Sequence, residues 1–191
     1  MRRLFVGLEL PSAARARLGA LCTGLANARW VRSENFHLTL RFIGDVDEAT
    51  ADDVHDALRE IYADGFPMHL RGLGFFATRR APRQIWVGVE PNPALMSLQK
   101  RISVAISSAT TRTGLVPEGR KFVPHVTFAR LRDVPACAVA DFLAMQEAFC
   151  VEAFPVRNFT LYSSKLSPGG PTYRVEAEYP LADFPSSAAA L

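Results

Sequence analysis

HLTL at residues 37–40 and HVTF at residues 125–128 are two copies of one pattern: a histidine, an apolar residue, a threonine and a second apolar residue. The copies start 88 positions apart, so almost half of the 191-residue chain separates them. Alternate side chains of a strand share a face, which puts His37 with Thr39, and His125 with Thr127, on one face. The apolar residues then point into a core. The repeat predicts two similar halves that present their polar faces to one cleft.

Short runs with a strand pattern alternate with four helical runs along the rest of the chain. The expected strands are residues 4–10, 29–31, 36–43, 68–76, 84–90, 123–131, 156–166 and 173–179. The expected helices are residues 12–26, residues 47–65 with Asp47 as N-cap, a helix opened by Asn92 and Pro93, and residues 136–148. Many short strands with helices on one face indicate an α+β fold with antiparallel sheets.

The composition is that of an ordinary globular protein, with 49% hydrophobic and 21% charged residues. No apolar run approaches the roughly 18 residues of a membrane span. The first apolar run ends at Glu9, too early for the core of a signal peptide. Cys22, Cys137 and Cys150 show no CxxC spacing, which favours a reducing compartment. We therefore expect a cytoplasmic protein with no membrane contact, and a monomer.

The tetrads are suited to chemistry at a phosphate group. Because histidine titrates near neutrality, one imidazole can act as a base while another acts as an acid. Threonine hydroxyls can donate to phosphate oxygens. The alternative for each histidine alone is a structural strand residue, and its repetition favours the functional interpretation. A zinc site is disfavoured because no third ligand stands at a recognisable spacing, so we expect neither a metal nor another cofactor.

Charge is distributed unevenly along the chain. The formal net charge is +3, yet residues 45–64 contain eight acidic residues against one arginine. Two groups of cations lie elsewhere: Arg112, Arg120, Lys121, Arg130 and Arg132 in one, and Arg79, Arg80 and Arg83 in the other. Such groups form either a solvated face or a surface for an anionic partner.

Five stretches together resemble the two-histidine phosphoesterase superfamily, and within it the LigT-like branch of RNA 2',3'-cyclic phosphodiesterases, historically called 2'-5' RNA ligases. They are RLFVGLELP at residues 3–11, WVRSENFHLTLRFIGDV at 30–46, PRQIWVGVE at 82–90, FVPHVTFAR at 122–130 and LYSSKLSPGGPTY at 161–173. The resemblance implies one two-lobed domain over residues 1–191, with pseudo-symmetric antiparallel sheets and outer helices around a central cleft. One tetrad then lies in each lobe.

The resemblance also implies a reaction and its residues. Water would open the 2',3'-cyclic phosphate at the end of an RNA, or on a small nucleotide, leaving a 2'-phosphate. His37 would be the proton donor and His125 the proton acceptor, with Thr39 and Thr127 holding phosphate oxygens. The basic groups would form a path for the RNA backbone. An RNA end-binding module without turnover and reversible 2'-5' ligation at the same site are the alternatives.

The roles of the residues around the tetrads are less well defined by the sequence pattern. Arg130 would neutralise phosphate charge, but strict alternation places it on the face opposite His125 unless a bulge intervenes. By the same alternation, Arg41 shares the face of His37 and borders the cleft. Trp30, Phe122 and Tyr173 are candidates either for base stacking or for the core.

Overall fold

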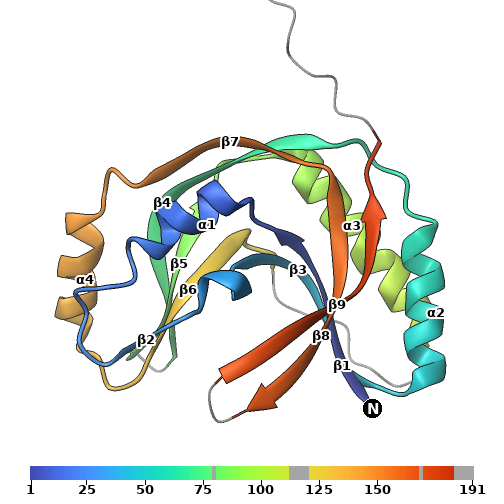
Figure 1. Ribbon diagram of the computed structural model, residues 1–191, viewed down its shortest axis with the longest axis horizontal. Coiled ribbons are helices and arrows are strands. Elements are labelled where there is room, and N and C mark those ends of the chain that lie inside the picture. The colour runs from blue at the N-terminus through green and yellow to red at the C-terminus, as the bar shows by residue number, and fades with distance from the viewer. Residues whose placement is uncertain (79–80, 112–120, 168–169, 183–191) are drawn as a thin grey trace, which may run out of the picture.

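The computed structural model describes residues 1–78, 81–111, 121–167 and 170–182. Within them nine strands and four α-helices confirm the expected α+β architecture (Figure 1). The strands are β1 (Arg2–Glu9), β2 (Ala28–Trp30), β3 (His37–Val46), β4 (Phe66–Thr78), β5 (Ala81–Val89), β6 (His125–Leu131), β7 (Cys150–Val156), β8 (Asn158–Ser167) and β9 (Gly170–Pro180). The helices are α1 (Ser12–Gly19), α2 (Glu48–Arg59), α3 (Pro93–Ala109) and α4 (Ala136–Met145), with a 3₁₀ turn, η1 (Ser33–Asn35).

The strands form two antiparallel groups that meet at the tetrads. One group runs β7-β4-β5-β6, and the other runs β3-β1-β8-β9, while β2 pairs with the free edge of β6. The two groups are continuous through β3 and β6, which pair at Leu38 and Val126. Each tetrad strand is thus the innermost strand of its own half. The two tetrads, far apart in the sequence, are therefore adjacent where the two groups of strands meet.

Helices α2, α3 and α4 lie at the two ends of the molecule. Figure 1 shows α2 and α3 side by side at one end of the molecule and α4 at the other. Leu95, Leu98, Ile102 and Ile106 of α3 are all buried, because their spacing gives one apolar face. Asp47 and Asn92 cap α2 and α3 by accepting backbone N–H groups at 2.9 and 3.0 Å, as expected.

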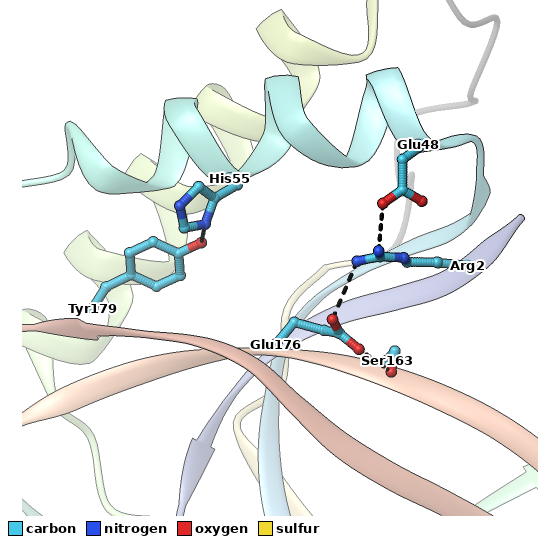
Figure 2. Close-up of polar contacts among 6 residues, drawn as sticks. All are labelled: Arg2, Glu48, His55, Ser163, Glu176 and Tyr179. Atoms are coloured by element: carbon cyan, nitrogen blue, oxygen red, sulfur yellow. Dashed lines mark hydrogen bonds and ion pairs between the residues drawn. The ribbon is translucent and has the colours of Figure 1, made fainter.

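Helix α2 is attached to the sheet by its polar side. Arg2 of β1 bonds both Glu48 of α2 and Glu176 of β9, and Ser163 of β8 donates to Glu176 at 2.6 Å (Figure 2). His55 of α2 lies with its Nδ1 atom 2.8 Å from the hydroxyl of Tyr179 on β9. Burial raises the pKa of that tyrosine to about 12, so the hydroxyl stays neutral.

Several element boundaries differ from the expectation, and α2 ends at Arg59 rather than at residue 65. The first helix ends at Gly19 rather than residue 26, and the chain after it turns at Gly24 and Asn27, both with positive φ. The expected strand 156–166 corresponds to β8, and β7 precedes it as a strand that the sequence analysis did not predict. Pro155 conceals β7 in the sequence, but β7 is the edge strand of its half, where proline is tolerated. No helix among the described residues is long and apolar enough to span a membrane.

Candidate active site

His37 and His125 are held by the same backbone interaction. The Nδ1 atom of each ring lies 2.7 Å from the carbonyl oxygen two residues earlier, on Asn35 and Val123 respectively. Since a carbonyl only accepts, each Nδ1 must carry a hydrogen, and the neutral ring then has an unprotonated Nε2. Two imidazoles are therefore in one defined tautomer, each with Nε2 available as a proton acceptor.

The register at the junction brings the two tetrads together. Leu38 pairs with Val126 in antiparallel register, so each histidine comes opposite the threonine of the other tetrad. The four polar side chains are half-buried, while Leu38, Leu40, Val126 and Phe128 are buried in the core. The expected polar and apolar faces are thus present on both strands.

Aromatic rings surround each histidine. The ring of His37 lies 4.9 Å from that of Phe5, 5.0 Å from Tyr173 and 6.1 Å from Tyr162. His125 lies 4.8 Å from Phe76, edge to face, and 6.1 Å from Trp86. These rings fix the imidazole orientations and remove water from around them.

The surroundings make both imidazoles weaker bases than free histidine. Burial lowers the pKa of His37 below 6.5, and the charges of His125 and Arg130 lower it further, against the bond to the Asn35 carbonyl. Burial likewise lowers the pKa of His125, against its bond to Val123. The effect of His125 and Arg130 on His37 indicates that the three share one electrostatic environment.

A β-bulge in each tetrad strand changes the alternation just after the tetrad. In the β5–β6 pairing, Trp86 opposes Thr127 and Ile85 opposes Ala129, so Phe128 is skipped. The bulge brings Arg130 onto the face of His125, where it opposes Gln84. It also explains why the charge of Arg130 acts on His37 and Tyr173.

The equivalent bulge in β3 corrects the expectation for Arg41. Leu40 is skipped where Val6 opposes Arg41 and Gly7 opposes Thr39. Arg41 consequently turns inward and is only 8% exposed, although it still borders the cavity. Phe42 takes the His37 face instead, with its ring 5.8 Å from that of Phe5. Arg130 and Phe42 are therefore structural counterparts in the two halves.

A cavity of about 930 Å³ opens on one side of the junction. Its lining includes His125 and Thr39 together with residues of β3 and α3, whereas His37 and Thr127 are not part of that lining. Gln84, also on its wall, accepts a hydrogen bond from the Thr127 hydroxyl at 3.4 Å. Among the described residues, no three or more His, Cys, Asp and Glu side chains are grouped as a metal site.

The aromatic candidates separate into different environments. Trp30 stacks on Phe128 at 6.3 Å and contacts Phe142 of α4, so it belongs to the core side of the sheet. Tyr173 contacts His37, and Phe122 borders the cavity. Of the basic groups, Arg83 and Lys121 also border the cavity. Arg79, Arg80, Arg112 and Arg120 lie outside the described residues.

A second repeat escaped the sequence analysis although it is readable. FVGLE at residues 5–9 and WVGVE at residues 86–90 share an aromatic residue, Val, Gly, an apolar residue and Glu. They lie on β1 and β5, each beside its tetrad strand, and supply the rings of Phe5 and Trp86 against the histidines. A Cβ on Gly7 would lie 2.9 Å from the carbonyl oxygen of Leu38 and 3.5 Å from the His37 ring.

Comparison with known proteins gives consistent similarities over both halves. The family described as LigT like phosphoesterase matches residues 8–86 and 89–173, which include both tetrads. An RNA 2',3'-cyclic phosphodiesterase of Aeropyrum pernix is 36% identical over 164 residues, covering 84% of this chain and 90% of the relative. One of Aquifex aeolicus is 33% identical over 155 residues, covering 79% and 80%. The crystal structure of E. coli LigT complexed with 3'-AMP superposes with a TM-score of 0.74 at 25% identity, covering 94% of this chain and 98% of that chain.

Proposed function

Because the chain belongs to the LigT-like phosphoesterase family, we propose that it is an RNA 2',3'-cyclic phosphodiesterase working without a metal ion. Water attacks the phosphorus of a terminal 2',3'-cyclic phosphate, and the bond from phosphorus to the 3'-oxygen breaks. The products are a 2'-phosphate and a free 3'-hydroxyl. His125 accepts the proton of the water, and His37 donates a proton to the departing 3'-oxygen.

The observation that carries the proposal is the matched bonding of the two imidazoles. Both Nδ1 atoms donate to backbone carbonyls at 2.7 Å, so both Nε2 atoms are available for proton transfer. One ring must enter the reaction neutral and the other protonated. Their lowered pKa values favour the neutral form of each in the free protein. The negative charge of a bound cyclic phosphate acts in the opposite direction, so His37 gains its proton together with the substrate.

Three further side chains stabilise charge on the phosphate in this proposal. Thr39 and Thr127 donate hydroxyl hydrogen bonds to non-bridging oxygens, with Thr127 exchanging its Gln84 partner for the substrate. Arg130, brought to this face by the bulge, balances the phosphate charge. Proton transfer and charge stabilisation are then all supplied by side chains of one two-lobed domain, acting as a monomer. Three free cysteines suit the reducing cytoplasm.

The test uses a synthetic RNA that ends in a 2',3'-cyclic phosphate, incubated with excess EDTA. We expect the unmodified protein to produce the 2'-phosphate, and His37→Ala or His125→Ala to reduce kcat on the order of 10²-fold or more. His69→Ala is the matched control, since His69 lies on β4 outside the site and faces Glu90. The position of the product phosphate is read by comparison with synthetic standards.

Other results would select the alternatives. A 3'-phosphate product would show that the 2'-oxygen leaves instead of the 3'-oxygen. Activity that is lost in EDTA but restored by a divalent ion would refute metal independence. RNA binding without turnover in any protein would indicate an end-binding module. Joined RNA in the presence of a 5'-hydroxyl fragment, faster than hydrolysis, would indicate 2'-5' ligation.

A further inference from the structure

The cavity beside the junction extends well beyond the two tetrads. From His125 and Thr39 it continues past Phe42 onto the side of α3, where Ser103 and Ser107 line it. Its volume of about 930 Å³ is at the upper end of the roughly 300–1,000 Å³ of small-molecule pockets. The extension has no part in the chemistry proposed above, which takes place at the terminal phosphate.

The charged residues of this extension that the structure describes are all cationic. Arg83 of β5, Lys100 of α3 and Lys121 border it and are all exposed. No Asp or Glu is among the described residues of its lining. The ion pairs formed within residues 1–78, 81–111, 121–167 and 170–182 also leave these three cations out. Their charge is therefore directed to solvent or to an anionic ligand.

Hydroxyl groups follow the same side of α3. Ser103 accepts a hydrogen bond from the Gln99 amide at 2.9 Å, which leaves its own hydrogen for another acceptor. The lining continues to Ser107 and Ser108, and the nine residues from Lys100 to Ser108 extend about 12 Å along the helix. Phosphates of a stacked strand follow each other at about 3.4 Å of rise, so more than one fits along this length.

An apolar surface lies between the junction and α3. The ring of Phe42 is 57% exposed on the His37 face of β3 and borders the cavity. Val104 of α3, 59% exposed, borders it farther out. A cationic groove with an exposed aromatic ring is the combination that binds single-stranded nucleic acid, because charges follow the backbone and bases stack on rings.

We propose that this α3 groove, defined by Phe42, Arg83, Lys100, Ser103, Ser107 and Lys121, binds the RNA strand that precedes the cyclic phosphate. The inference rests on the proposed function, since it takes the terminal phosphate to lie between the histidines. A 2',3'-cyclic phosphate occupies the 3' end, so the strand can leave the site only in its 5' direction. The substrate is accordingly an oligonucleotide, which the groove distinguishes from a cyclic mononucleotide.

The experiment compares a cyclic mononucleotide with an RNA tetranucleotide that carries the same terminal cyclic nucleotide. Arg83→Gln, Lys100→Gln and Lys121→Gln are made singly and together, with Arg157→Gln as the control because Arg157 is an exposed cation between β7 and β8. We expect the ratio of kcat/KM for the tetranucleotide to that for the mononucleotide to fall about tenfold in the triple variant. The slope of log kcat/KM against log salt for the tetranucleotide should become shallower by about 0.7 per removed contact, or about 2 in total.

Equal ratios in the triple variant, Arg157→Gln and the unmodified protein would overturn the groove while leaving the hydrolytic function intact. If the unmodified protein turns over neither substrate, the proposed function fails, and a binding measurement then decides whether the α3 groove binds RNA. In that case the affinity for a fluorescein-labelled tetranucleotide with a 3'-phosphate is measured by anisotropy. Weaker binding by the triple variant alone supports the groove, and equal binding refutes it.

Discussion

Replacing Gly7 by alanine tests whether the position of His37 depends on close packing of β1 against β3. The new Cβ would lie 2.9 Å from the Leu38 carbonyl oxygen, whereas ordinary contact begins at 3.4 Å, so about 0.5 Å of movement is required. The obstacle is backbone and cannot rotate away. Overpacking of this kind costs about 1–3 kcal/mol of the free energy of unfolding. Domains are usually stable by about 5–15 kcal/mol, so the variant stays folded.

The same movement displaces His37, because Leu38 is its neighbour and the His37 ring lies 3.5 Å from the new Cβ. A misplacement of about 1 Å can cost 10²-fold in rate, so 0.5 Å should reduce kcat/KM by about tenfold. Unfolding is followed in urea, and kcat/KM is measured on the cyclic-phosphate RNA at 25 °C.

Gly19→Ala is the matched control, because a Cβ at Gly19, at the end of α1, would meet nothing within 4 Å. It should be neutral or stabilise the protein by up to about 1 kcal/mol, with unchanged kcat/KM. Unchanged stability and activity in Gly7→Ala would refute the packing argument. Reduced stability with full activity would refute only its coupling to His37.

The remaining predictions concern the electrostatics of the site. Because the pKa values of both His37 and His125 lie below 6.5, the bell-shaped profile of kcat/KM should have its maximum below pH 6.5; a maximum above pH 7 would contradict the lowered values. Arg130→Gln removes a positive charge that lowers the pKa of His37, so that pKa should rise in an NMR titration of the ring protons. Arg132→Gln, an exposed neighbour paired with Asp133, should leave the titration unchanged, and an equal shift in both variants would show that Arg130 has no specific effect.

The tetrads could be predicted from sequence because strand alternation is local. His37 with Thr39, and His125 with Thr127, needed only a period of two residues. Alternation failed one residue after each tetrad, since a bulge depends on how the neighbouring strand pairs and not on the bulged strand itself. The strand face on which Arg130 and Arg41 lie could therefore not be predicted from the pattern alone.

Other parts of the site required the third dimension. Phe42 and Gln84 come to the cavity through strand pairing between distant segments, which no single stretch of sequence encodes. Helix α3 was predicted from Asn92 and Pro93, which open it, but these two residues do not indicate which face of the helix borders a cavity. Ser103 and Ser107 can be connected with the cavity only once the position of α3 beside the junction is known.

The carbonyl groups that orient the two imidazoles have a consequence for how the sequence can vary. Asn35 and Val123 have unrelated side chains, yet both provide the same acceptor at the same distance. Substitution at either position leaves that acceptor in place as long as the strand entry keeps its path. Both acceptors are also uncharged, unlike the carboxylate that often partners a histidine. Neither acceptor therefore makes its imidazole a stronger base than the other. The orientation of the two histidines therefore depends on the path of the backbone before each tetrad and not on the side chains at positions 35 and 123.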